Sequence, residues 1–151
     1  MSDPVNPNLR EITRILAVDY GAKRVGLAMS DETKTIASPL TQLNVESDAD
    51  AVEKIVGAIG DRQVERVVVG LPRNMDGSYG PQAQKVQMFI EKLREKMAVP
   101  IETWDERLTT AAAERAMLEA DLSRAKRKER RDKIAAQILL QSYLDARSFN
   151  R

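Results

Sequence analysis

The sequence predicts a single α/β domain built around a mixed β-sheet, and three observations support this. Short, continuously apolar runs are typical of strands that are buried on both faces. Two such runs near the N-terminus flank a short turn, which indicates an antiparallel hairpin. In the second half, apolar runs alternate with amphipathic helical stretches, which indicates parallel strands. We expect residues 1–11 to form a flexible tail and residues 12–151 to form the domain.

The first half of the chain is expected to contain the hairpin, a third strand and a helix, in the order Ile15–Val18, Val25–Met29, Ile36–Leu43 and Ser47–Asp61. Pro39 indicates that the third strand is an edge strand or an irregular segment, because proline cannot donate a backbone hydrogen bond. Ser47 is a suitable N-cap for the helix. The apolar face of this helix is expected to carry Val52, Ile55, Val56 and Ile59.

The second half is expected to contain two strands and three helices. In order, these are Val67–Val69, a helix that begins at Pro81, Ile101–Trp104, Thr109–Ala120 and Asp132–Arg147. Pro81 suits the first position of a helix and follows a loop, Arg73–Gly80. The apolar stripe of that helix is Val86, Phe89, Ile90, Leu93 and Met97.

The absence of cysteine and histidine restricts the chemistry that this chain can perform. It excludes disulfides, thiol nucleophiles, zinc fingers and catalytic triads that use histidine. Carboxylates with a hard divalent metal ion are the natural alternative. No apolar run is long enough to span a bilayer, and the N-terminus has no signal-peptide pattern, so we expect a cytoplasmic protein.

Acidic residues occupy three unexpected positions. Asp19 ends an apolar strand, and Asp105 and Glu106 end another. Because ligands bind beyond the carboxyl ends of strands in α/β sheets, these acids can converge there. Asp132 falls on the apolar stripe of the last predicted helix, where a carboxylate is costly unless it is paired or bound to a metal. The three positions together favour a metal site.

Each acid also has a purely structural interpretation. Asp19 would then be a turn residue, and Asp105 and Glu106 would form surface ion pairs or cap the following helix. Asp132 would be an N-cap or a first-turn acid that complements the helix dipole. Alternation along a strand allows only one of Asp105 and Glu106 to point toward Asp19, and it does not say which one. The longer side chain of Glu106 favours that residue.

A basic segment adjoins Asp132 and is a candidate phosphate-binding surface. Its residues proposed to bind nucleic acid are Lys126, Arg127, Lys128, Arg130 and Arg131. Lys23, Arg24 and Arg107 are further candidates, although each side chain also suits a solvated turn or an ion pair. Ser78, in the loop before Pro81, is a supporting candidate for phosphate binding, although the local sequence favours a plain connection with a turn at Asp76-Gly77. Asp105 is a candidate partner that orients Arg107. The alternative for the basic segment is a solvated charged face.

Four motifs in order resemble the YqgF family, also called the RuvX family, of Holliday-junction-resolvase-like and pre-16S rRNA-processing nucleases. The motifs are Asp19–Ala28 with Ser30-Asp31, Val69–Pro72 with Met75–Ser78, Trp104–Thr110, and Asp132–Leu140. They cover about Ile15 to Asp145. One departure is that Ala120–Ser123 lacks the glycine that many relatives have there.

The resemblance implies an RNase H-like fold, a bacterial cytoplasmic setting and a hydrolase with a carboxylate triad of Asp19, Glu106 and Asp132. The mechanism it implies is phosphodiester hydrolysis with two Mg²⁺ or Mn²⁺ ions. The first expected function is processing of the 5′ end of pre-16S rRNA. The alternatives are a resolvase acting on branched DNA and a non-catalytic ribosome-assembly factor that binds nucleic acid.

The remaining expectations concern partners. A sugar-kinase-like or actin-like ATPase also opens with Asp-x-Gly, but such proteins need two domains of this type, so we expect no nucleotide cofactor. We expect no membrane partner. A monomer and a homodimer both remain open, because a junction resolvase needs two active sites and an rRNA nuclease does not.

Overall fold

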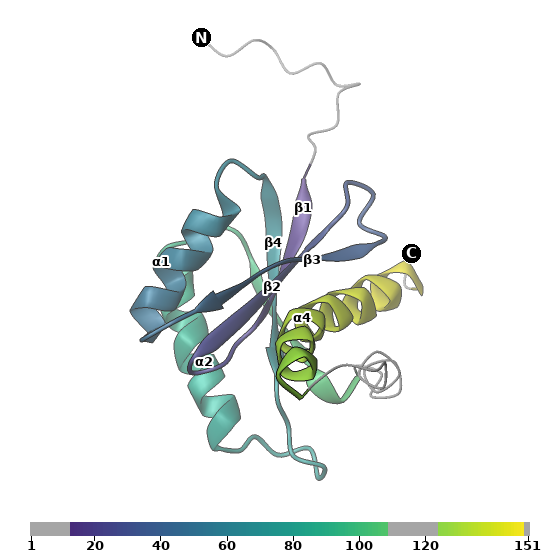
Figure 1. The fold of residues 1–151 in the computed structure, drawn as a ribbon. Coiled ribbons are helices and arrows are strands. Elements are labelled where there is room, and N and C mark those ends of the chain that lie inside the picture. The colour runs from purple at the N-terminus through teal and green to yellow at the C-terminus, as the bar shows by residue number, and fades with distance from the viewer. Residues whose placement is uncertain (1–12, 109–123, 150–151) are drawn as a thin grey trace, which may run out of the picture.

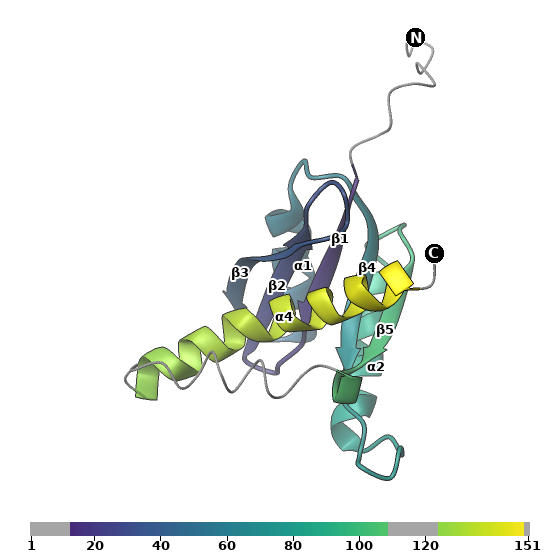
Figure 2. The same ribbon diagram turned by 90° about the vertical axis from the view of Figure 1, so that its right-hand side faces the viewer.

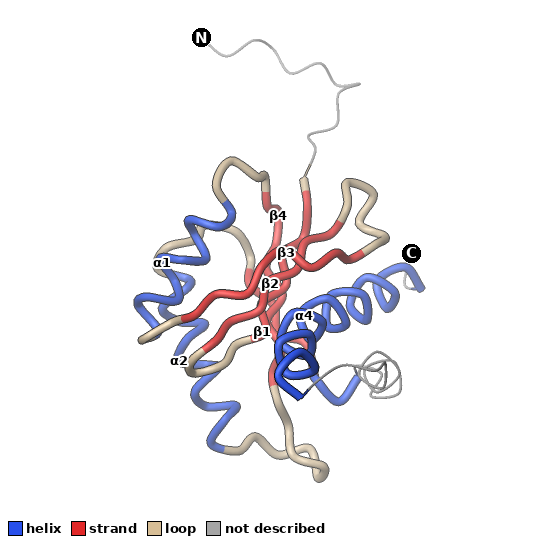
Figure 3. The backbone as a smooth tube through the Cα atoms, in the orientation of Figure 1, coloured by secondary structure: helices blue, strands red, loops and turns tan. Residues whose placement is uncertain are grey.

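The computed structural model describes residues 13–108 and 124–149, with side chains in the last helix from residue 134 to residue 148. The predicted tail at residues 1–11 and the predicted helix Thr109–Ala120 lie outside the described residues. Five strands form one mixed sheet, and helices cover both of its faces (Figures 1 and 3). The prediction of a single α/β domain with a mixed sheet is confirmed.

The strands lie in the order β3-β2-β1-β4-β5. Their bounds are β1 Arg14–Asp19, β2 Arg24–Ser30, β3 Ala37–Asn44, β4 Val64–Leu71 and β5 Ile101–Asp105. Strands β1, β2 and β3 pair antiparallel, whereas β4 pairs parallel with both β1 and β5. Both the predicted hairpin and the predicted parallel half are therefore confirmed. The edge position of β3 agrees with Pro39, which lies opposite Ala28 where the register shifts.

Two helices cover one face of the sheet. Helix α1 (Asp48–Ile59) is capped by the Ser47 side chain, which accepts a hydrogen bond from the Asp50 amide, and helix α2 (Pro81–Arg94) begins at the predicted proline. Their apolar stripes pack on the sheet in a buried cluster that includes Leu16, Val18, Leu27, Ile55, Val69, Phe89 and Leu93. Val56 is the exception to the predicted α1 stripe, since it is 44% exposed.

Helix α4 (Arg124–Phe149) covers the other face and crosses the strands (Figure 2). Its buried cluster with the sheet consists of Ile15, Ala17, Ala28, Ala37, Val68, Ala136, Leu139, Leu140, Tyr143 and Leu144. The predicted start of this helix at Asp132 was wrong, because the helix begins at Arg124 and includes the whole basic segment. Asp132 therefore lies inside the helix and is neither its N-cap nor a first-turn residue.

Polar contacts tie α4 to both edges of the sheet. At β3, the Gln141 side chain accepts a hydrogen bond from the Ala37 amide at 2.9 Å. At β5, the Tyr143 hydroxyl donates to Glu102 at 2.6 Å. These contacts fix the position of the helix along and across the strands. Within the described ranges, no helix is both long enough and apolar enough to cross a membrane.

Ser30 provides a test of how the first two strands are joined. Ser30 is buried, and its Oγ accepts a hydrogen bond from the Ile15 amide at 2.9 Å. Ser30→Ala removes that acceptor from a buried N–H, so we expect a loss of about 1–3 kcal/mol in the free energy of unfolding. Urea denaturation measures it, and Ser38→Ala at an exposed position of β3 is the control. Equal losses in the two variants would contradict this role of Ser30.

Candidate active site at the carboxyl edge of the sheet

The carboxyl ends of β1, β4 and β5 lie together at one edge of the sheet. Val18 is in register with Val69, so Asp19 and Gly70 follow at the same level on neighbouring parallel strands. Gly70 is in turn in register with Trp104, and Leu71 with Asp105. Glu106 comes next and begins a short 3₁₀ helix, η1 (Glu106–Leu108). The predicted meeting of acids from two strand ends at one edge therefore agrees with the topology.

Asp19 belongs to the face of the sheet that α4 covers. Ile15 and Ala17, which alternate with Leu16 and Val18 along β1, are buried in the cluster beneath α4, and Asp19 continues that alternation. The next residue, Tyr20, lies on the opposite face: its ring stacks on Phe89 of α2 with the centroids 4.6 Å apart. Asp19 and Tyr20 thus separate toward opposite faces of the sheet.

The Tyr20 hydroxyl is held by α1. It donates a hydrogen bond to Asp48 at 2.6 Å. Burial, and after it the contact with Asp48, raises the pKa of Tyr20 to about 12. The phenol therefore stays protonated at neutral pH, and Tyr20 acts as an anchor for the end of β1 instead of a base.

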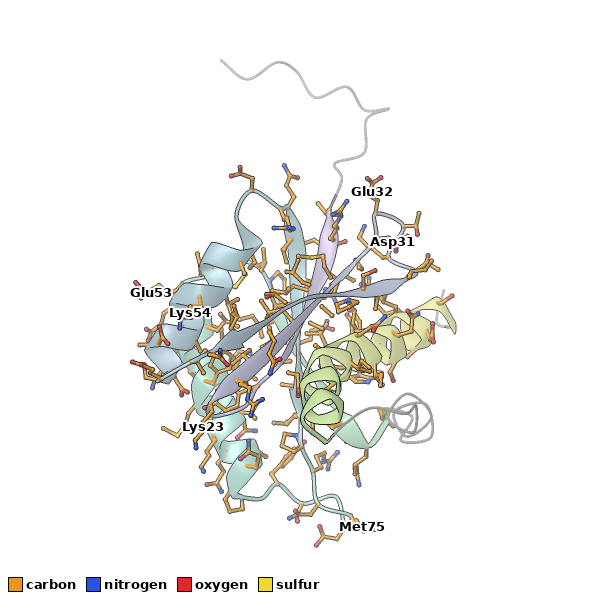
Figure 4. All side chains as sticks on the ribbon, in the orientation of Figure 1. Lys23, Asp31, Glu32, Glu53, Lys54 and Met75 are labelled. Atoms are coloured by element: carbon orange, nitrogen blue, oxygen red, sulfur yellow. The ribbon has the colours of Figure 1, made fainter. Side chains whose placement is uncertain are left out.

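The turn after Asp19 requires a glycine. A Cβ added at Gly21 would lie 2.5 Å from the carbonyl oxygen of Arg24, which no real side chain tolerates. Lys23, labelled in Figure 4, is exposed in this turn, and Arg24 is partly buried at the start of β2. The Asp-x-Gly pattern thus combines an acid at the strand end with the small residue that lets the chain reverse directly behind it.

The Glu106 side chain lies over Gly70. A Cβ added at Gly70 would be 2.9 Å from Glu106 Oε1 and 3.2 Å from Glu106 Cγ. It would also be 3.2 Å from Leu139 Cδ2, and Leu139 belongs to α4. The carboxylate of Glu106 therefore lies on the α4 face, beside the strand that ends in Asp19. The space it occupies exists because residue 70 has no side chain.

Sequence reasoning missed this role of Gly70, because the strand was expected to end at Val69. The signal was present, because Gly70 interrupts an otherwise apolar run between Val69 and Leu71. An isolated glycine in a buried strand often marks the close approach of another group. In this protein that group is a carboxylate.

Asp105 has different surroundings from its neighbour Glu106. Its Oδ2 accepts from Arg107 Nη2 at 2.8 Å and its Oδ1 accepts from the Arg107 amide at 2.9 Å, while Arg73 Nη1 lies 3.7 Å from Oδ2. The hydrogen bond from the Arg107 guanidinium is the largest cause of a lowered Asp105 pKa. Asp105 is therefore an ionised anchor for two arginines, and the predicted pairing of Asp105 with Arg107 agrees with this geometry.

The predicted supporting residue Ser78 lies inside the loop between β4 and α2. Its Oγ donates to Asp76 at 2.6 Å and its amide donates to the same oxygen at 2.9 Å. These contacts, the side-chain one first, lower the pKa of Asp76. The described contacts of Ser78 are thus internal to the loop.

Ser30 and Asp31, which belong to the first motif, lie at the opposite end of the sheet. Asp31 Oδ1 accepts from the amides of Thr35 and Ile36 at 2.8 and 2.9 Å, and this closes the turn between β2 and β3. Figure 4 labels Asp31 far from Lys23 and Met75, which mark the carboxyl edge. The two motif residues therefore have structural roles.

Asp132 and the basic segment lie in the first part of α4. Asp132 precedes Ala136, which is fully buried against the sheet, by one helical turn. The side chains of residues 124–133 are outside the described part. Among the side chains that are described, no group of three or more acids lies close enough together to hold a metal ion. The structure thus places Asp19 and Glu106 on one face and places Asp132 only by its backbone.

Relatives at about half identity cover nearly the whole of this chain. A protein of Thermoanaerobacter pseudethanolicus is 49% identical over 134 residues, which are 88% of this chain and 96% of the relative. A protein of Caldanaerobacter subterraneus subsp. tengcongensis is 51% identical with the same coverage. Both carry the name of a candidate pre-16S rRNA nuclease.

Solved structures share the fold at low identity. RuvC of T. thermophilus, in complex with a Holliday junction substrate, matches with a TM-score of 0.55 and 14% identity, over 90% of this chain and 96% of that one. The Holliday junction resolvase of fowlpox virus matches with a TM-score of 0.52 and 15% identity, over 89% and 99%. The predicted RNase H-like fold is confirmed by these likenesses.

The family model for RuvX, described as Holliday junction resolvase, matches residues 13–146. This match covers all five strands and most of α4, including the edge where Asp19, Gly70 and Glu106 meet. The resemblance inferred from the four sequence motifs is therefore confirmed. On this match and on the identity shared with its relatives, the chain belongs to the RuvX family of nucleases.

Proposed function

We propose that this nuclease hydrolyses phosphodiester bonds at a centre formed by Asp19, Glu106 and Asp132. The observation that carries the proposal is the Glu106 carboxylate lying over Gly70, on the face and at the edge where Asp19 ends β1. Asp132 lies away from the ends of α4, one turn before the buried Ala136, and this supports its membership of the centre. A carboxylate that faced the sheet there would be costly unless it were paired or bound to a metal.

Mg²⁺ or Mn²⁺ suits the donor set of this centre. The whole sequence lacks histidine and cysteine, so the ligands would be carboxylate oxygens, which hard divalent ions prefer. The missing side chain at Gly70 leaves room for a carboxylate oxygen of Glu106 beside the end of β1. When bound, two such ions would supply an activated water and stabilisation of the leaving oxygen. Asp19, Glu106 and Asp132 would hold them.

The nucleic-acid surface that we propose is the basic first part of α4 with the turn after β1. It comprises Lys126, Arg127, Lys128, Arg130 and Arg131 of α4, with Lys23 and Arg24. Because these cations flank the proposed carboxylate centre, they would attract a phosphate backbone to it. Arg107 contributes less, since its guanidinium is already paired with Asp105 at 2.8 Å.

The first substrate that we propose is pre-16S rRNA, cut during processing of its 5′ end. Relatives that are about half identical carry the corresponding name. Branched DNA is the second candidate, favoured by the description of the family model and by the junction bound to the structural neighbour RuvC. The first candidate takes precedence because it rests on far higher sequence identity.

Asp19→Asn tests the proposed centre. The substitution removes a ligand charge with little change of shape, so we expect metal-dependent cleavage to fall by at least about a hundredfold while the fold survives. Cleavage of a pre-16S rRNA fragment and of a four-way DNA junction is measured in parallel with Mg²⁺ and with Mn²⁺. Asp61→Asn, at an exposed position after α1, is the matched control. Full activity of a folded Asp19→Asn variant would remove Asp19 from the centre.

Glu106→Gln and Asp105→Asn separate the two neighbouring acids. Glu106 lies on the α4 face, whereas Asp105 holds Arg73 and Arg107. We therefore expect Glu106→Gln to lose most of the single-turnover activity at saturating Mn²⁺ and Asp105→Asn to lose clearly less. An inactive Asp105→Asn enzyme beside an active Glu106→Gln enzyme would reverse the assignment.

Gly70→Ala tests the space that Glu106 occupies. The added Cβ would meet Glu106 Oε1 at 2.9 Å and Leu139 Cδ2 at 3.2 Å, so the carboxylate must move. We expect a folded protein with cleavage reduced roughly tenfold or more, because displacement of a reacting group by about 1 Å is costly. Gly57→Ala, where the added Cβ meets nothing within 4 Å, is the control. Equal activity of the two variants would show that the position of Glu106 is not critical.

A further inference from the structure

The segment Arg73–Gly80, which we call the β4–α2 loop, carries an apolar side chain far into solvent. Met75 is 98% exposed, and Figure 4 shows it at the end of the loop, away from the body of the domain. Tyr79 of the same loop is 49% exposed. A single exposed methionine is common on protein surfaces. Met75 differs from such a case in the ordered loop that carries it and in the contacts of that loop with the candidate active site.

Hydrogen bonds hold the β4–α2 loop in one conformation. The Asn74 amide donates to the Ser78 carbonyl at 2.9 Å, and the Gly77 amide donates to the Asn74 carbonyl at 2.8 Å. Gly77 has a φ of 88°, which glycine adopts without strain. Asp76 accepts from the amide and the hydroxyl of Ser78. The residues on both sides of Met75 are therefore fixed.

Side chains at the base of the loop brace it against the candidate active site. Arg73 donates to the Gly77 carbonyl, and its guanidinium lies 4.6 Å from the centre of the Tyr79 ring. Arg107, the residue after Glu106, donates to the Asn74 carbonyl at 3.4 Å. Asp105 holds both arginines. The loop is thus connected directly to the strand end that carries Glu106.

The charges of this region are largely paired with one another. Arg73 and Arg107 are balanced by Asp76 and Asp105, both of which have lowered pKa values and are ionised at neutral pH. Each guanidinium also donates hydrogen bonds within the protein, Arg73 to the Gly77 carbonyl and Arg107 to Asp105. What the loop offers to a ligand is therefore the apolar side chain of Met75.

We propose that Met75 packs against an unpaired base of the nucleic-acid substrate beside the cleavage site, so that the enzyme prefers strands that are unpaired or branched there. This inference rests on the proposed function. The apolar surfaces of a nucleic acid are its base faces, and in a regular duplex those faces are covered by stacking. An unpaired base exposes its face at the lowest cost in free energy. A rigid loop gains from such a contact because its ordering cost is already met within the protein.

The experiment measures binding separately from cleavage. The full-length protein is titrated in EDTA against two fluorescein-labelled RNA duplexes that differ by one unpaired adenosine. We expect Met75→Ser to weaken binding to the bulged duplex about tenfold, because burial of a methionine side chain is worth about 1.5 kcal/mol or more. Binding to the paired duplex should change less than about twofold. Met88→Ser, at a 62% exposed position of α2, should change neither.

Each alternative result has a definite meaning. Equal losses on both duplexes, no loss on either, or an equal effect of Met88→Ser would overturn the proposal. Equal affinity of the unmodified protein for the two duplexes would also overturn the proposal. The exposed Met75 side chain would then be a candidate contact for a protein partner. Selective binding through Met75 without any metal-dependent cleavage by the same protein would uphold the contact and refute the proposed nuclease centre. Thermal unfolding checks that both variants are folded.

Discussion

The close packing of α4 on the sheet is the constraint on which the candidate active site depends. Ala17, Ala28 and Ala37 present small side chains from three neighbouring strands, and Ala136 meets them from the helix. Larger residues at these positions would hold the helix farther from the strands, since the distance between packed elements is set by the side chains at their contact. On the opposite face, α1 and α2 pack over larger strand side chains, among them Leu16, Leu27 and Val69.

Two polar anchors make this packing specific. Gln141 accepts a hydrogen bond from the backbone amide of Ala37 at one edge of the sheet, and the Tyr143 hydroxyl donates one to Glu102 at the other. Trp104 adds an edge-on contact with the Tyr143 ring at 5.5 Å. The helix therefore has one position across the strands. Because α4 is continuous, this also fixes where the backbone of its earlier turns lies.

Much of this arrangement follows from local rules that a sequence displays. Ser47 and Pro81 correctly indicate where α1 and α2 begin, and Pro39 indicates the edge strand. The pattern of buried runs separates the antiparallel half of the sheet from the parallel half. The edge shared by Asp19 and Glu106 could be predicted because carboxyl ends of parallel strands meet in space. Alternation could not choose between Asp105 and Glu106, since it does not identify which face receives the last helix.

Other features depend on tertiary contacts that no local pattern reveals. The expected start of α4 at Asp132 lies eight residues after the observed start, because the basic segment lacks the apolar periodicity that predicts a helix. Arginine, lysine and alanine are good helix formers, and their propensities would have favoured the earlier start. Val56 has the spacing of the apolar stripe of α1, but it lines an open groove together with Lys92 of α2 and Lys96, which follows that helix. Gly70 becomes significant only when Glu106, from another strand, is seen above it.

The order of the strands has a consequence for how the protein folds during its synthesis. Strand β1 pairs with β4, a partner made much later in synthesis, and α4 from the end of the chain covers both. Pairings between distant segments form slowly, and this one cannot form on a ribosome until β4, which ends at Leu71, has emerged; Glu106 emerges later still. Asp19 and Glu106 are therefore apart for most of translation. An incomplete chain that has not reached α4 therefore carries Asp19 and Glu106 without the helix that covers their face of the sheet.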